Sequence, residues 1–375
     1  MSSTYLDHHA TTPCDPRVVE AMLPFFTEHF GNAGSLTHAH GRKASNAVEE
    51  ARVAVARFFG VLPPEILFTA GATESNNIAL AFLGSGDHVI SAKGEHKSVL
   101  APLERLERAG VEVTLLTPDR EGRISADGVA KAIRPHTRLV SVEAANGEIG
   151  TIQPLGAISA VCRARGVLLH SDVTQAAGKI PLDFRDLDLA SFSGHKIYGP
   201  KGIGGLFVRR GIRAVPVIVG GGQERGIRSG TVNVPGAVGL AMALRIRGDE
   251  MESEAQRLAV LRDELRDRLL ESIPDASVNG PRELRLPGNL NVSFGRVEAE
   301  SLLLAMKRFS LSTGSACSSG QRGPSHVLKA IGLSDELALG SIRIGLGRAN
   351  TLEIVGPLVD DLERAVRRLR EISPP

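Results

Sequence analysis

Between about residues 60 and 210 the sequence alternates short β-rich runs with longer helical stretches. Alternation of this kind predicts an α/β fold, in which a parallel sheet has helices on both faces. Ligands of such sheets bind beyond the carboxyl ends of the strands. The residues that directly follow each apolar run are therefore the first candidates for a functional site. The predicted strands are residues 65–70, 88–92, 111–117, 138–144, 167–172, 188–193 and 204–210.

The C-terminal part of the chain has a different pattern. A long helical stretch near 237–272 precedes apolar runs at 289–294 and 341–347, and an amphipathic helix follows. At 375 residues the chain exceeds the usual size of a single domain. We expect a large domain over residues 15–255 and a smaller α/β domain built from residues 1–14 and 256–375.

Composition and charge exclude several classes of function. The formal net charge is +2 and no long basic run occurs, so no nucleic-acid partner is expected. No segment approaches the roughly 20 apolar residues that span a bilayer, and the N-terminal residues lack the pattern of a secretion signal, so no membrane partner is expected. The adjacent histidines of DHHATT (7–12) point to opposite sides of an extended segment, which argues against a metal site. Three cysteines without metal or redox spacing favour the reducing cytoplasm.

Side chains with useful chemistry follow several of the predicted strands. Each has an ordinary alternative explanation, such as a helix cap or a turn. Together, however, they place an acid, a lysine, imidazoles and hydroxyls at one edge of the sheet. This set matches the needs of pyridoxal phosphate: an acid for the pyridine nitrogen, a lysine for the Schiff base, and hydroxyls with a helix N-terminus for the phosphate. The residues are Ala72, Thr73, His96, Asn146, Asp172, Gln175, Ser193, His195 and Lys196.

Longer motifs make the interpretation more specific. The chain contains FTAGATESNN (68–77), SFSGHKIYGPKGIG (191–204), GGGQERGIRSGT (220–231), GSACSSG (314–320) and SIRIGLGR (341–348). Through them it resembles the cysteine desulfurases of the NifS/IscS kind, in the class V aminotransferase branch of the fold-type I enzymes. The likeness covers nearly the whole length, and GSACSSG favours the desulfurases over other class V enzymes. It implies removal of sulfur from L-cysteine, which gives L-alanine and a persulfide on Cys317.

The resemblance also implies a role for each site residue. Lys196 would bind the cofactor covalently and act as the base at the substrate α-carbon. Asp172 would keep the pyridine nitrogen protonated, Gln175 would bind the phenolic oxygen, and His96 would stack on the ring and assist proton transfers. The guanidinium of Arg343 would bind the substrate carboxylate. The phosphate ligands would be Ala72, Thr73, Ser193 and His195, with Thr231 reaching the phosphate of the other subunit in an obligate homodimer.

Two further expectations concern the sulfur-carrying loop and a departure from the family. Cys317 lies among small residues and can attack only as a thiolate, for which His96 is the candidate proton acceptor. The loop has the length of the group whose cysteine hands sulfur to an acceptor protein such as an iron–sulfur scaffold. Gly147 stands where the family usually has an asparagine that contacts the phenolic oxygen. That hydrogen bond is missing, or comes from Asn146 or water, and Asn146 is also expected at the substrate.

Other readings of the same residues stay open. A selenocysteine lyase or another class V aminotransferase could use this scaffold, although a transaminase would not need Cys317. A non-catalytic assembly subunit is disfavoured because the set of site residues is otherwise whole. Cys162, inside a helical pattern, is expected to be a buried structural residue.

Overall fold

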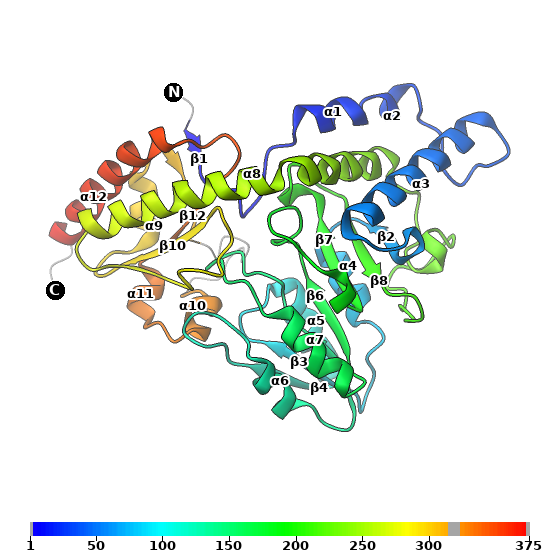
Figure 1. Cartoon of the computed structure of the whole chain (residues 1–375), viewed down its shortest axis with the longest axis horizontal. Helices are drawn as coiled ribbons and strands as arrows, with labels where there is room; N and C mark the ends of the chain where they lie inside the picture. The colour runs from blue at the N-terminus through cyan, green and yellow to red at the C-terminus, as the bar shows by residue number, and fades with distance from the viewer. Residues whose placement is uncertain (1–2, 314–322, 373–375) are drawn as a thin grey trace.

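The computed structural model describes residues 3–313 and 323–372. Within them, the main sheet has seven strands in the order β2-β8-β7-β6-β5-β3-β4, flanked by helices (Figure 1). The expected α/β class, with a large and mainly parallel sheet, is confirmed. The strands are β2 (Ile66–Thr69), β3 (His88–Ala92), β4 (Glu112–Leu116), β5 (Thr137–Ser141), β6 (Leu168–Asp172), β7 (Leu189–Ser193) and β8 (Gly204–Val208).

One strand departs from the parallel arrangement that the alternation predicted. β8 is antiparallel to both of its neighbours, β7 and β2. Only residues 194–203 join β7 to β8, whereas a parallel crossover needs a dozen or more residues. The chain therefore turns back directly, and Lys196 lies in this turn, at the end of the 3₁₀ helix Gly194–Lys196.

Alternate side chains of the strands enter two separate cores on the two faces of the sheet. Leu67 and Val89 pack with α4 (Ala72–Leu80) and α5 (Lys97–Arg108). Their neighbours Phe68 and Ile90 pack on the opposite face. Because both faces are covered, functional groups can reach solvent only at the strand ends. The helices of the second face include α3 (Ala39–Phe59), α7 (Leu155–Ala164) and the first half of α8 (Val234–Ser272).

The second half of α8 belongs to another core. Its side chains Leu258, Leu261, Leu265 and Leu269 pack with a three-stranded antiparallel sheet and two helices. Ile246 is the last α8 side chain in the core of the main sheet, and Leu258 is the first in the other core. The predicted domain boundary at residue 255 falls between them. The boundary itself stays a prediction. The elements are β9 (Ala276–Val278), β10 (Asn289–Phe294), β12 (Ser341–Gly345), α9 (Ala299–Ala305) and α12 (Val355–Ile372).

The N-terminal segment connects the two cores and reaches the functional edge of the main sheet. β1 (Thr4–Tyr5) pairs in parallel with β11 (Phe309–Ser310). The chain then passes β12, and the Thr12 N–H donates to the carbonyl oxygen of His195 at 2.9 Å. Across the part of the chain that the structure describes, no helix has the length and apolar character to cross a membrane. The remaining helices are α1 (Pro16–Met22), α2 (Pro24–Thr27), α6 (Ala126–Ala132), α10 (His326–Ala330) and α11 (Asp335–Leu339).

Candidate active site

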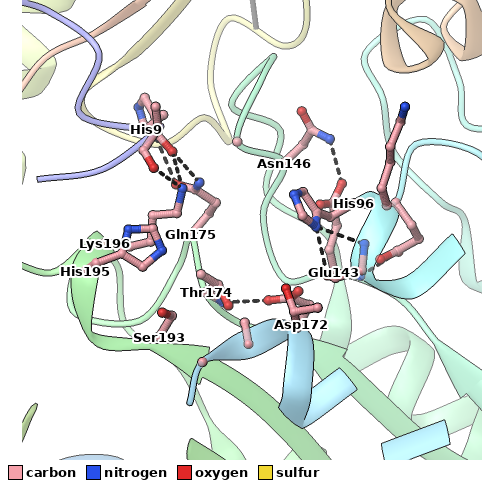
Figure 2. A pocket seen from close by; sticks show the side chains of 18 of the residues that line it. His9, His96, Glu143, Asn146, Asp172, Thr174, Gln175, Ser193, His195 and Lys196 are labelled. Carbon is pink, nitrogen blue, oxygen red and sulfur yellow. Dashed lines mark hydrogen bonds between the residues drawn. The ribbon is translucent and has the colours of Figure 1, made fainter. Parts of the chain in front are cut away.

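A cavity of about 850 Å³ lies beyond the carboxyl ends of the main-sheet strands (Figure 2). This is where the strand-end rule placed the functional residues. Among the described residues, Thr231 is exposed and does not line this cavity. Cys317 lies outside the described residues. The predicted residues that line the cavity are Ala72, Thr73, His96, Asn146, Asp172, Gln175, Ser193, His195, Lys196 and Arg343.

Lys196 is held in the cavity wall by the N-terminal segment. Its Nζ donates to the carbonyl oxygens of His9 at 2.7 Å and Ala10 at 2.6 Å. Thr12 fixes the same segment to the lysine turn, because its Oγ1 donates to the carbonyl oxygen of His195 at 2.9 Å. The sequence pattern singled out the lysine but gave no sign that residues 9–12 position it.

Asp172 ends β6 and is buried, with 8% of its surface exposed. Nδ2 of Asn76 donates to its Oδ2 at 2.8 Å, and the Thr174 N–H donates to its Oδ1 at 3.0 Å. These two bonds fix the orientation of the carboxylate at the cavity floor. Asn76 was not predicted, since an amide in the middle of a helix has no sequence signal beyond its place on the buried face of α4.

His96 is the N-cap residue of α5, and this role decides which ring nitrogen carries its proton. The Ser98 N–H donates to His96 Nδ1 at 3.1 Å. A neutral ring with that bond must carry its proton on Nε2. Acceptance of a proton from the Cys317 thiol, which was expected of His96, would then occur at Nδ1, with loss of the Ser98 bond and formation of the charged imidazolium.

The other end of the cavity suits an anion. Ala72 and Thr73 form the first turn of α4, and the preceding Gly71 gives that helix no side-chain cap. The first N–H groups of a helix and its dipole attract negative charge. His195 and Lys201 also line the cavity. Burial and the charge of Lys196 lower the pKa of His195 to about 4, so its ring is neutral.

Gln175 belongs to a hydrogen-bonded group that the sequence did not reveal. Its Oε1 accepts from Lys179 Nζ at 2.8 Å and lies 3.0 Å from His9 Nδ1. Its Nε2 donates to the carbonyl oxygen of His9 at 3.0 Å. Burial, together with the charge of Lys196, holds the pKa of Lys179 well below its ordinary value. The amide of Gln175 therefore has one defined orientation, with Nε2 toward the His9 carbonyl oxygen and Oε1 toward Lys179.

Arg343 comes from β12 and links the small sheet to the cavity. Its Nη2 donates to Asp7 Oδ1 at 2.7 Å, and its Nη1 donates to the Gly147 carbonyl oxygen at 3.2 Å. Ser312 Oγ also donates to Asp7 Oδ1, at 2.9 Å. The neighbours of Arg343 along the strand, Ile342 and Ile344, enter the core that packs on the three-stranded sheet, as strand alternation requires.

The amide of Asn146 is fully engaged inside the protein. Its Nδ2 donates to Glu143 Oε1 at 2.7 Å and to the Gly94 carbonyl oxygen at 3.2 Å. Its Oδ1 accepts the N–H groups of residues 148 and 149, each at 2.9 Å. A Cβ at Gly147 would lie 2.7 Å from Gln175 Nε2, so Gln175 already occupies the space beside this glycine. Ligand binding by Asn146 stays a prediction, and it would require exchange of one of these bonds.

Three buried glutamates in the wall, Glu95, Glu143 and Glu148, were missed. Burial raises the pKa of Glu143 to about 8 and that of Glu148 to about 7. Burial and the adjacent Glu143 raise the pKa of Glu95 well above its ordinary range. Acids next to strand ends look like ordinary polar turn residues in a sequence. By contrast, Cys162 is buried as expected, and its pKa is raised to about 12 by burial.

Comparison with known proteins gives consistent matches over the whole chain. The model of the family described as aminotransferase class-V matches residues 4–358. The cysteine desulfurase IscS of Anaeromyxobacter dehalogenans is 49% identical, covering 99% of this chain and 94% of that protein. The IscS of Rickettsia akari is 48% identical over 99% of this chain and 92% of its own length.

Solved structures agree with the sequence matches. A NifS-like protein superposes with a TM-score of 0.91 and is 37% identical, covering 98% of this chain and all of its own. The structure of SspA in complex with cysteine has a TM-score of 0.82 and 38% identity, covering 92% of this chain and 99% of that one.

Proposed function

The chain belongs to the aminotransferase class-V family, among the cysteine desulfurases of the IscS kind, and on that premise we propose how its residues take sulfur from L-cysteine. The cofactor of this family is pyridoxal phosphate, and the products would be L-alanine and a persulfide on Cys317. The observation that carries the proposal is the convergence of Lys196, Asp172, His96 and Arg343 on one cavity.

The cavity fits pyridoxal phosphate on the groups that the structure presents. An uncapped helix N-terminus lies at one end and the buried carboxylate of Asp172 at its floor. Thr174 Oγ1 is buried in the wall and has no hydrogen-bond partner in residues 3–313 and 323–372. A buried hydroxyl without a partner is costly, and a polar ligand removes that cost. The proposed holders of the cofactor are Ala72, Thr73, His96, Asp172, Gln175, Ser193, His195 and Lys196.

The residues of this chain divide the chemistry between them. When bound, the cofactor supplies a ring that withdraws electrons from the substrate carbon. Asp172 would hold a proton at the ring nitrogen, and Lys196 Nζ would remove the proton from the substrate α-carbon. Asp7 orients the guanidinium of Arg343 for the substrate carboxylate. Cys317 would take the sulfur.

We also propose that the working form is a homodimer. The α1–α2 region exposes large apolar side chains that a monomer would leave in water, Leu23, Phe26, Phe30 and Leu36. Thr231 stays outside the wall of its own chain, as a residue that serves the other subunit's phosphate would. The sulfur acceptor would be a protein such as an iron–sulfur scaffold, in the cytoplasm.

The test is the turnover of L-cysteine by the purified protein loaded with pyridoxal phosphate. We expect a visible absorption band, equimolar alanine and transferable sulfur, and a persulfide on Cys317. Lys196→Ala should lose the band of the covalently bound cofactor, and Cys317→Ser should keep the band but form no persulfide. Formation of an oxo acid in place of alanine would establish a transaminase, and a colourless protein that takes up no cofactor would contradict the proposal.

A further inference from the structure

Glu143 lies in the cavity wall two residues beyond β5, on backbone that the sheet holds rigidly. The N–H groups on both sides of it donate to β6, Val142 to His170 O at 3.1 Å and Ala144 to Asp172 O at 2.9 Å. Its own N–H donates to Glu95 Oε1 at 2.7 Å. Only 8% of Glu143 is exposed. The carboxyl group is therefore fixed at the cavity and is not a mobile surface acid.

The surroundings of this carboxyl group keep it protonated. Glu95 and His96 face it from the start of α5, Asp172 from the end of β6, and Glu148 from the loop beyond Asn146. The negative charges of Asp172 and Glu148 add to the effect of burial, whereas the amide of Asn146, which donates to the carboxyl oxygen, and the charged form of His96 oppose it. A carboxylic acid that holds its proton at neutral pH can act as a general acid.

The reaction needs such an acid. Conversion of cysteine to alanine replaces a carbon–sulfur bond at the β-carbon by a carbon–hydrogen bond. In neutral His96, Nδ1 accepts a hydrogen bond from the Ser98 N–H. The ring can act as an acid only as the imidazolium, so it must first take up a proton. Glu143 carries its proton at rest on the same side of the cavity (Figure 2).

We propose that Glu143 is the general acid that protonates the β-carbon of the substrate. As the nucleophilic thiolate forms its sulfur–sulfur bond, the electron pair of the carbon–sulfur bond stays with carbon. The carbon then takes the proton of Glu143, and the O–H pair remains on the carboxylate. The proton that the attacking thiol released restores the acid, so that no oxidant or reductant is needed. This inference rests on the proposed desulfurase activity.

The test compares Glu143→Gln with the wild-type holoenzyme. Glutamine keeps the shape and the oxygen that accepts from Asn146, but it has no acidic proton. We expect alanine formation to slow at least tenfold. General acid–base catalysis typically contributes about 10²- to 10⁴-fold, so tenfold is the smallest loss consistent with the proposed role. The wild-type rate should fall as the pH rises through about 8, and the variant should lack this limb.

An infrared measurement gives a readout independent of turnover. The difference between the wild-type and Glu143→Gln spectra should contain a carboxylic-acid carbonyl band that disappears with a midpoint near pH 8, since the buried Glu95 and Glu148 contribute to both spectra. Glu271→Gln, an exposed glutamate of α8, is the matched control and should behave as wild type. A loss of less than tenfold, an unchanged high-pH limb or an unchanged band would overturn the inference. An inactive wild-type enzyme would instead contradict the proposed function.

Discussion

Substitution of Glu143 by glutamine should stabilise the protein while it slows alanine formation. The size of the gain in the free energy of unfolding follows from the environment of the carboxyl group. Burial raises the pKa of Glu143 from 4.5 to about 8. Between these values the unfolded chain loses a proton that the native state retains, so stability falls as the pH rises. The protonated Glu143 therefore makes its full contribution to the free energy of unfolding below pH 4.5, and this contribution is lost by about pH 8. At about 1.4 kcal/mol per pH unit, the loss accumulated at pH 7 is about 3 kcal/mol.

Glutamine does not titrate, and it keeps the hydrogen bond from Asn146. We therefore expect Glu143→Gln to raise the free energy of unfolding by about 3 kcal/mol at pH 7, with a smaller gain at pH 6 and a larger one at pH 8. The assay is urea unfolding of the holoenzyme at a fixed cofactor concentration, with Glu271→Gln as the control. A gain that is the same at all three pH values, or a loss of stability at pH 8, would refute the reasoning.

Three other substitutions test further contacts of the site. Asn76→Leu removes the hydrogen bond to Asp172 and should raise the Kd for pyridoxal phosphate about tenfold, corresponding to about 1.4 kcal/mol; an unchanged titration of cofactor absorbance would count against this support role. Gly147→Asn places a Cβ 2.7 Å from Gln175 Nε2 and should lower the free energy of unfolding by about 1–3 kcal/mol, a change that an unaltered urea midpoint would disprove. Arg343→Lys loses the guanidinium fork and should raise KM for cysteine at least about tenfold with the cofactor band retained, and an unchanged KM would remove Arg343 from the substrate site.

The strand-end residues could be predicted because topology determines their position. A parallel strand must end at the same edge as its neighbours, so Asp172 and His96 could be placed at one edge once the strands were recognised. The direction of β8 was also implicit, since the ten-residue connection 194–203 is too short for a crossover. What the sequence could indicate was which residues share an edge.

The contacts between distant segments could not be predicted in this way. Lys196 is positioned by the carbonyl groups of His9 and Ala10, and backbone acceptors leave no trace in side-chain identity. Asn76 points inward from α4 and Lys179 from the turn residues after β6, and polar residues in both places are equally typical of the solvent-facing surface. Their roles depend on the packing of α4 and of the residues after β6 against the cavity, which periodicity does not specify.

The separation of the two kinds of titratable group is a requirement of the proposed chemistry. Lys196 lies with His9 and Gln175 on one side of the cavity, and Glu143 lies with His96 and Asn146 on the other (Figure 2). An amine that acts as a base must be uncharged, and a carboxyl group that acts as an acid must be protonated. In direct contact the two would exchange the proton and form an ion pair, in which neither could act. Their placement on different elements, β7 with its turn and the extension of β5, therefore allows one cavity to take a proton from the α-carbon and to deliver one to the β-carbon.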